Sequence, residues 1–291
     1  MTKRQYYSVR AGKNTGENFP IETLRELIFR TYHFFYEKEY FQEAFGKMCV
    51  DAGLISGTCG SDIQGYFLRK LRKHSIWPID DFYTKYSDDD IFDVIELLFD
   101  LVSKPIEGTY HDWSDCGWHY SDFDKNLGQE EFRVEINEIL RDYKQGYELS
   151  NDGEVLLLGD KGLSFLLEAK IPEYDLNNVD NRVEVAILKF RRYRASLNER
   201  KDAVRDLADV LEYLRPQIKD HMLSKDESEL YNIANNFAIR HHNDKQKKDY
   251  DALWLSWIFY IYLSTIHMMV RTMKKAESSE GRRSIESKFK K

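Results

Sequence analysis

The sequence has little proline and little cysteine: 5 of its 291 residues are proline and 3 are cysteine. Cys49, Cys59 and Cys116 are odd in number and widely spaced, which argues against a disulfide framework and favours reduced thiols. The first residues, MTKRQYY, lack the apolar core of a signal peptide. With few helix breakers and 32% charged residues, we expect a mainly helical cytoplasmic protein.

Several common catalytic motifs are also missing. The sequence contains no glycine-rich phosphate-binding motif, no HExxH metalloprotease motif and no Gly-x-Ser-x-Gly nucleophile elbow. Their absence argues against the usual nucleotide-binding and hydrolase classes. Hydrophobic residues make up 42% of the chain, which is enough to bury a sizeable core.

The charge is unevenly distributed around a net value of −7. Residues 80–124 hold 13 acidic and 2 basic residues, whereas residues 189–205 hold 7 basic and 2 acidic ones. Residues 271–291 hold 8 basic and 3 acidic ones. Two basic segments in the C-terminal part indicate an anionic partner there, despite the acidic total.

The pattern along the chain predicts four regions. Residues 1–145 are expected to form a helical N-terminal domain, with one helix over 41–52 and no clear period over 106–128. Residues 146–176 hold a β-hairpin, turning at Asn151-Asp152-Gly153, and a linker. Residues 177–275 show four helical patterns with short connections, which predict an antiparallel bundle. Residues 276–291 are expected to be a basic, disordered tail.

One long apolar run, LWLSWIFYIYLSTIHMMV, covers residues 253–270. It has about the minimum length of a membrane span. However, it contains Ser256, Ser264, Thr265 and His267, and basic residues flank both of its ends. We interpret it as the buried central helix of the bundle and expect no membrane association.

The C-terminal part resembles a HEPN domain, and the whole layout is similar to AbiJ-like abortive-infection proteins. The resemblance rests on Tyr7-Ser8-Val9-Arg10, on the hairpin at residues 147–158, and on Ile239-Arg240-His241 before the last helix. It implies a prokaryotic phage-defence protein, a homodimer through the bundle, and an antiviral RNA endonuclease that needs no metal or other cofactor. The alternative is a non-catalytic HEPN-like module for dimerisation, RNA binding or sensing.

The implied catalytic residues are Arg240, His241 and His242. In this resemblance a histidine moves the proton of an RNA 2′-hydroxyl and an arginine stabilises the phosphorane. The family places the histidine four to six residues beyond the arginine, where this chain has Lys245, Gln246 and Lys247. The two histidines directly follow Arg240 instead. A structural alternative is that Arg240 only caps the end of its helix.

Two further groups are candidate sites. Lys245 and Lys247, together with Arg191, Arg192 and Arg194, are candidate RNA-phosphate contacts, although basic residues on a helix are commonly just solvated. His111, Cys116 and His119 are weak candidates for metal ligands, because their spacing matches no common zinc finger and no fourth ligand is evident. Packing of an aromatic loop is the competing interpretation, and we expect no metal.

Overall fold

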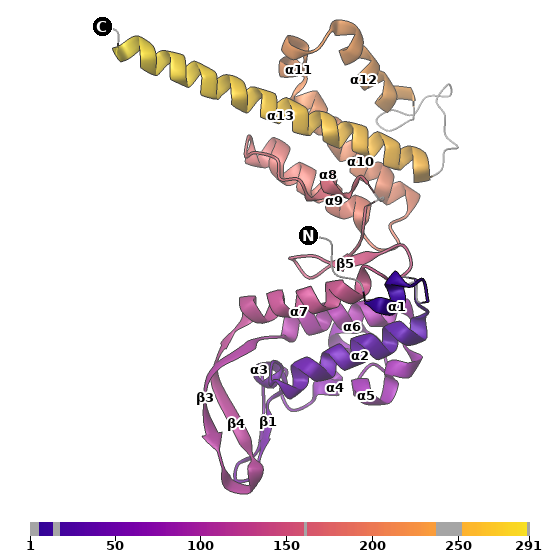
Figure 1. The fold of residues 1–291 in the computed structure, drawn as a ribbon, viewed down its shortest axis with the longest axis vertical. Coiled ribbons are helices and arrows are strands. Elements are labelled where there is room, and N and C mark those ends of the chain that lie inside the picture. Colours follow the sequence, from indigo (N-terminus) through magenta and orange to yellow (C-terminus); the bar gives the residue numbers. More distant parts are fainter. Residues whose placement is uncertain (1–5, 14–17, 160–161, 237–251, 290–291) are drawn as a thin grey trace. The chain divides into compact units, whose positions relative to one another are not determined.

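A computed structural model describes residues 6–13, 18–159, 162–236 and 252–289. The described part is mainly helical, as the sequence predicts. It divides into two compact units, Met1–Leu158 and Gly159–Lys291 (Figure 1). Three small antiparallel two-stranded sheets accompany the helices in these ranges, so the expectation of one hairpin is corrected.

Unit 1 contains seven α-helices, two short 3₁₀ helices and all six strands of the described residues. In chain order they are α1 (Tyr7–Arg10), α2 (Ile21–Glu37), α3 (Gln42–Phe45), β1 (Lys47–Cys49), β2 (Gly53–Ile55), α4 (Ile63–Leu71), α5 (Ile79–Phe82), η1 (Tyr83–Lys85), α6 (Asp88–Leu101), β3 (Lys104–His111), η2 (Trp113–Asp115), β4 (Gly117–Asp124), α7 (Lys125–Leu140), β5 (Tyr147–Leu149) and β6 (Val155–Leu157).

The core of unit 1 lies between α2, α6 and α7. Apolar residues at helical spacing face inward from α2 and α6, among them Leu24, Ile28 and Ile95, which are fully or nearly fully buried. The rings of Phe35 and Phe132 meet edge to face at 5.2 Å between α2 and α7. This packing holds the helices from which the hairpins extend.

The start of α6 is fixed by a capping box. From Ser87-Asp88-Asp89-Asp90 the sequence predicts an N-cap and an acidic first turn at this place. The Ser87 hydroxyl accepts the Asp90 N–H, and the Asp90 carboxylate accepts the Ser87 N–H. Lys73 pairs with the same carboxylate at 2.9 Å. Burial opposes ionisation of Asp90, but the bonds from Lys73 and Ser87 outweigh it and lower its pKa.

Two of the three hairpins were not expected from the sequence. β1 lies in the segment 41–52, for which a single helix was predicted. It pairs with β2, which follows directly after that segment. Only α3 of this segment is helical. It ends before Gly46, which has φ 79° and has no room for a side chain, because a Cβ there would lie 2.0 Å from the Ile55 carbonyl oxygen. β3 and β4 form a second hairpin, which connects α6 to α7 (Figure 1).

The third hairpin, β5–β6, confirms the prediction for residues 147–158. Tyr147 pairs with Leu157 and Leu149 with Val155. Asn137 in α7 clamps the hairpin, because its side chain donates to the Leu149 carbonyl at 3.0 Å and accepts the Leu149 N–H at 2.6 Å.

Unit 2 consists of helices in the residues that the structure describes. They are α8 (Ser164–Glu168), the π-helical η3 (Leu176–Asp180), α9 (Asn181–Arg191), α10 (Leu197–Tyr213), α11 (Arg215–His221), α12 (Ser224–Asn236) and α13 (Ala252–Phe289). The break between α10 and α11 falls directly before Pro216, as expected for a proline inside a helical pattern. α13 continues through residues 276–289, which the sequence predicts as a disordered tail.

The core of unit 2 forms where α9, α10 and α13 pack together. Leu207, Ile258 and Leu263 are fully buried, and the rings of Phe190 and Phe259 stack at 4.0 Å. The apolar run at 253–270 is therefore a helix with a buried face. Over Ala252–Glu277 it is also long and apolar enough to cross a membrane, with 56% of its most apolar window buried in the unit.

Candidate metal centre

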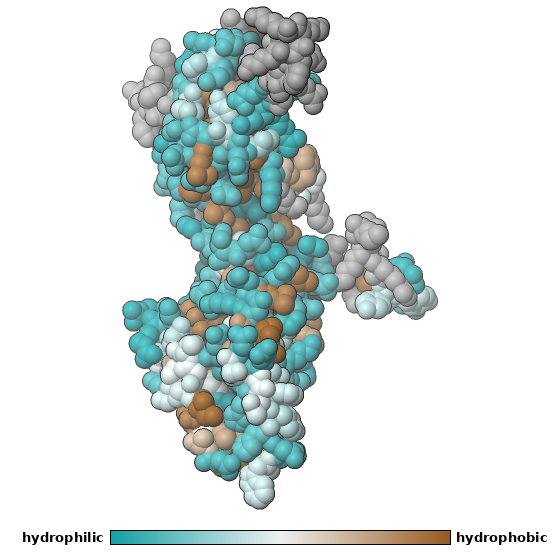
Figure 2. Space-filling model, turned by 90° about the vertical axis from the view of Figure 1, so that its left-hand side faces the viewer, coloured by the Kyte–Doolittle hydropathy of each residue, from teal (hydrophilic) through white to brown (hydrophobic). Residues whose placement is uncertain are grey.

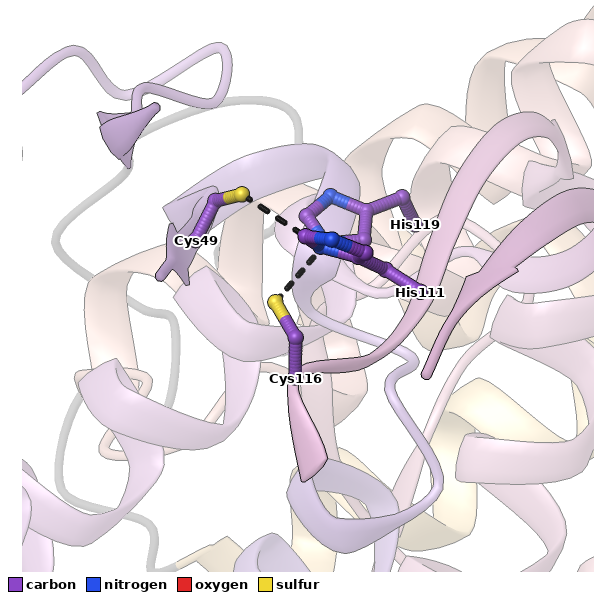
Figure 3. Close-up of side chains that lie close together, drawn as sticks. All are labelled: Cys49, His111, Cys116 and His119. Atoms are coloured by element: carbon purple, nitrogen blue, oxygen red, sulfur yellow. Dashed lines mark hydrogen bonds between the residues drawn. The ribbon is translucent and has the colours of Figure 1, made fainter. Parts of the chain in front are cut away.

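Four potential metal ligands meet where the first two hairpins of unit 1 come together. They are Cys49, His111, Cys116 and His119, and we call them the Cys2His2 cluster. Each offers one ligand atom, and all four atoms lie within 4.8 Å of one another. Figure 3 shows the two sulfurs turned toward the two imidazole rings.

The distances are close to those of an occupied tetrahedral site. Cys49 Sγ lies 3.7 Å from His111 Nδ1, and Cys116 Sγ lies 3.1 Å from His119 Nε2. With Zn–S bonds of about 2.3 Å and Zn–N bonds of about 2.0 Å, neighbouring ligand atoms in a tetrahedron lie roughly 3.3–3.8 Å apart. The separations in the cluster, all within 4.8 Å, exceed these values by about an ångström at most.

The hairpin register explains why three of the ligands converge. His111 pairs with Gly117, and His119 pairs with Thr109. Both histidines therefore project from the same face of β3–β4, since cross-strand partners share a face and side chains alternate along a strand. Cys116 ends the turn between the strands, directly before Gly117, whose φ of 87° leads the chain into β4.

The fourth ligand comes from the other hairpin. Cys49 ends β1 and is buried. Backbone N–H groups of Ala52 and Asp51, followed by the His111 and Cys116 side chains, lower the pKa of the Cys49 thiol against the opposing effect of burial. Metal binding requires the thiolate, so this environment suits a ligand.

An outer group orients His111. Its Nε2 lies 3.2 Å from the Asp51 carboxylate, while its Nδ1 faces Cys49. A carboxylate on the distal nitrogen of a ligating histidine fixes the tautomer and raises the basicity of the ligand. The arrangement therefore contains both a ligand set and a support for it.

The set favours zinc in a structural role. Two thiolates and two imidazoles in a tetrahedron are typical of Zn²⁺, and four protein ligands leave no open position for a substrate. A Cys49–Cys116 disulfide would use the sulfurs but would leave the two converging histidines unexplained.

The structure supplies Cys49 as the fourth potential ligand, which the sequence did not reveal, and the expectation of no metal stays a prediction. Sequence analysis named His111, Cys116 and His119 but placed Cys49 in a predicted helix. The signal for a hairpin at Cys49 is the short sequence Asp51-Ala52-Gly53 that follows it, because aspartate and glycine favour a turn over a helix. Cys59 lies outside the cluster, and burial raises its pKa to about 11.

Of the other predicted site residues, the structure describes only those of the basic segment in unit 2. Arg240, His241, His242, Lys245 and Lys247 lie outside the described residues. In unit 2, Arg192 and Arg194 are exposed, whereas Arg191 is 7% exposed. A buried arginine is poorly placed to contact a phosphate directly, so of these three the exposed pair fits that role better.

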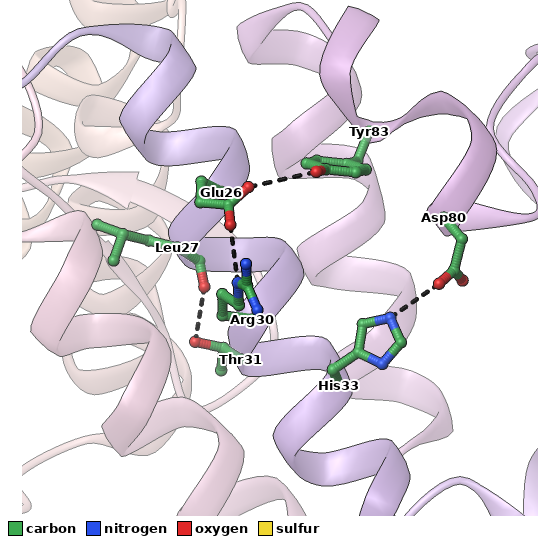
Figure 4. Close-up of polar contacts among 7 residues, drawn as sticks. All are labelled: Glu26, Leu27, Arg30, Thr31, His33, Asp80 and Tyr83. Carbon is green, nitrogen blue, oxygen red and sulfur yellow. Dashed lines mark hydrogen bonds and ion pairs between the residues drawn. The ribbon is translucent and has the colours of Figure 1, made fainter.

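A second polar cluster of unit 1 connects α2 to α5 and η1 (Figure 4). His33 Nε2 lies 2.8 Å from the Asp80 carboxylate. The Tyr83 hydroxyl donates to Glu26 at 3.3 Å, and Glu26 also pairs with Arg30 at 2.7 Å. Since the Tyr83 ring stacks on Phe29 at 3.9 Å, we interpret this cluster as packing between helices.

Compared with protein-family models, curated proteins and solved structures, the chain matches none of them. The functional interpretation therefore depends on the geometry of the Cys2His2 cluster and on the sequence.

Proposed function

We propose that this protein binds one Zn²⁺ ion through Cys49, His111, Cys116 and His119, and that the ion holds the hairpins β1–β2 and β3–β4 together. The convergence of the four ligand atoms within 4.8 Å carries the proposal. A two-stranded hairpin is marginally stable by itself, and β1–β2 has strands of only three residues. A metal ion bound by both hairpins would supply the stabilisation that neither hairpin has by itself.

Metal analysis of the purified full-length protein tests this proposal. The wild type should contain about one equivalent of zinc per chain, and Cys49→Ser or Cys116→Ser should lose most of it. Cys59→Ser is the matched control, because it removes a buried thiol outside the cluster and should retain the metal. Cobalt substitution should give the visible bands of a tetrahedral thiolate site.

Two results would contradict the proposal. One is a wild-type protein, purified under reducing conditions without chelator, that neither contains nor takes up zinc. The other is equal metal loss in the Cys59→Ser and Cys116→Ser variants, since that would indicate general unfolding. Circular dichroism of each variant separates unfolding from ligand loss.

A second candidate function concerns unit 2 and follows from the resemblance to HEPN domains. We propose a phage-defence protein of the abortive-infection type that dimerises through this unit and binds or cleaves RNA. The packing of α9, α10 and α13 around one core supports it, as does the exposure of Arg192 and Arg194.

Expression of Arg240→Ala beside the wild type tests the catalytic version. Growth arrest and RNA cleavage should fall by about a hundredfold or more in the variant if Arg240 stabilises the phosphorane. Cleavage without added divalent metal and with a cyclic phosphate product should accompany it. A folded protein that binds RNA but never cleaves it would favour the non-catalytic alternative.

A further inference from the structure

The β3–β4 hairpin carries aromatic rings on the face opposite its metal ligands. Tyr110 and Trp118 are cross-strand partners, and each is adjacent in sequence to a histidine of the cluster, so the two rings project from the other face. Their centroids lie 5.5 Å apart, and Trp118 stacks on Tyr120 at 5.7 Å with an angle of 18° between the rings. We call Tyr110, Trp118 and Tyr120 the aromatic face.

This face is open to solvent in unit 1. Tyr110 is 49% exposed and Trp118 is 45% exposed. Trp113, in the turn between the two strands, is 69% exposed. Figure 2 shows brown and pale atoms gathered at the lower end of the molecule, where Figure 1 places β1, β3 and β4. Large exposed apolar and aromatic groups concentrated in one place are typical of interaction sites.

The segment that carries the rings is acidic. Residues 104–124 contain five acidic residues and one basic residue. That basic residue, Lys104, is already paired with Glu131 at 2.7 Å. A phosphate backbone would be repelled here, whereas a cationic side chain would be attracted by the carboxylates and by the ring faces.

We propose that the aromatic face binds an arginine- or lysine-rich segment of a partner protein. The rings would receive guanidinium or ammonium groups by cation–π contact, and the surrounding carboxylates would steer the segment and pair with its remaining charges. The proposal builds on the zinc-binding function above, because the metal holds the hairpin that presents these rings. Charge complementarity selects this occupant over RNA.

Binding of a fluorescent oligo-arginine peptide to the full-length protein, followed by anisotropy at constant ionic strength, tests the proposal. The double variant Tyr110→Ala/Trp118→Ala should bind about tenfold more weakly, because each exposed ring contributes one cation–π contact. Its net charge equals that of the wild type, so a loss reports the rings rather than general electrostatic attraction. Phe165→Ala in α8 is the matched control, since it removes a 61% exposed ring from the other unit and should leave binding unchanged.

A second variant examines the carboxylates. Asp112→Asn/Asp115→Asn should weaken peptide binding and reduce its salt dependence. The proposal is overturned if the Tyr110/Trp118 double variant binds the peptide as well as the wild type does. It is also overturned if an RNA oligonucleotide binds this face and loses affinity when the rings are removed.

Zinc content measured on the same preparations separates the two proposals. If the protein holds zinc and the rings make no difference to peptide binding, the partner proposal alone fails. If the protein holds no zinc but peptide binding still depends on Tyr110 and Trp118, the zinc proposal fails and the partner surface stands.

Discussion

Cys49 and His111 are 62 positions apart in the sequence, and their side chains lie 3.7 Å apart in the structure. Neither residue stands out alone, since an isolated buried cysteine commonly behaves as a small apolar residue. What makes the pair informative is the second cysteine–histidine pair beside it. Cys116 and His119 add two more ligand atoms, so that the four residues together match the ligand set that one zinc ion prefers.

Gln42 is a buried polar residue that bonds β4, the strand of His119, to the helical part of unit 1. It is 9% exposed, its amide donates to the Trp118 carbonyl at 3.0 Å, and its side-chain oxygen accepts the Tyr120 N–H at 2.7 Å. These two bonds bracket His119 on β4. The geometry of that ligand therefore depends on a residue of α3.

We predict that Gln42→Ala lowers the free energy of unfolding by about 1–3 kcal/mol, because it leaves backbone groups of β4 without partners. Urea denaturation followed by tryptophan fluorescence measures the change. Zinc affinity should fall as well. Gln129→Ala is the control, since Gln129 lies in α7 and donates to the Phe99 carbonyl of α6 at 3.0 Å, and not to a strand of the cluster. Equal zinc affinity in the Gln42 variant and the wild type would contradict the anchoring role.

At the scale of elements, the two hairpins differ from the helices in what stabilises them. α2, α6 and α7 bury apolar faces against one another, and side chains cap the N-termini of α6 and α7, namely Ser87 and Asp124. β3–β4 carries aromatic and ionisable residues on both faces and buries little. Its order comes from α6 and α7 at its ends, from Gln42, and in our proposal from the metal.

Helix α13 contains the apolar run at residues 253–270, and its two faces differ. Leu255 is 1% exposed within the core of unit 2, whereas Leu253, two positions earlier, is 73% exposed. We predict that Leu255→Asp gives insoluble protein, because an unpaired buried charge costs several kcal/mol. Leu253→Asp should remain soluble, which a comparison of soluble fractions after expression would show.

The same experiment addresses membrane association, which the helix length and composition alone would allow. Recovery of the wild-type protein in the membrane fraction only, together with equal behaviour of both variants, would contradict the assignment of α13 to a protein core. The absence of a membrane partner and the cytoplasmic location remain predictions from the sequence.

At the scale of the whole molecule, the chain has two units with separate cores. The metal cluster lies entirely in unit 1, and the residues of the second candidate function lie in the part of the chain that belongs to unit 2. A structural metal in one unit and an RNA-acting bundle in the other are therefore compatible proposals. Each can fail without the other.

Removal of zinc should affect the two units differently. We predict that a chelator accelerates amide hydrogen exchange in β1–β2 and β3–β4 by on the order of tenfold or more, because apo hairpins open more readily. Amides of α10 and α13 should exchange as before, since their protection comes from apolar packing. Exchange followed by mass spectrometry on the full-length protein measures both, and a uniform increase across the two units would contradict a local role for the metal.

The sequence alone determined the mainly helical content, the N-cap of α6, the β5–β6 hairpin and three of the four cluster residues. These features follow from local signals: helical periodicity, caps, a turn sequence and short spacing. Only the tertiary structure showed that Cys49 joins His111, Cys116 and His119, and that residues 104–124 form a hairpin. The physical reason is that contact between distant segments depends on how the helices pack, and no local period records it.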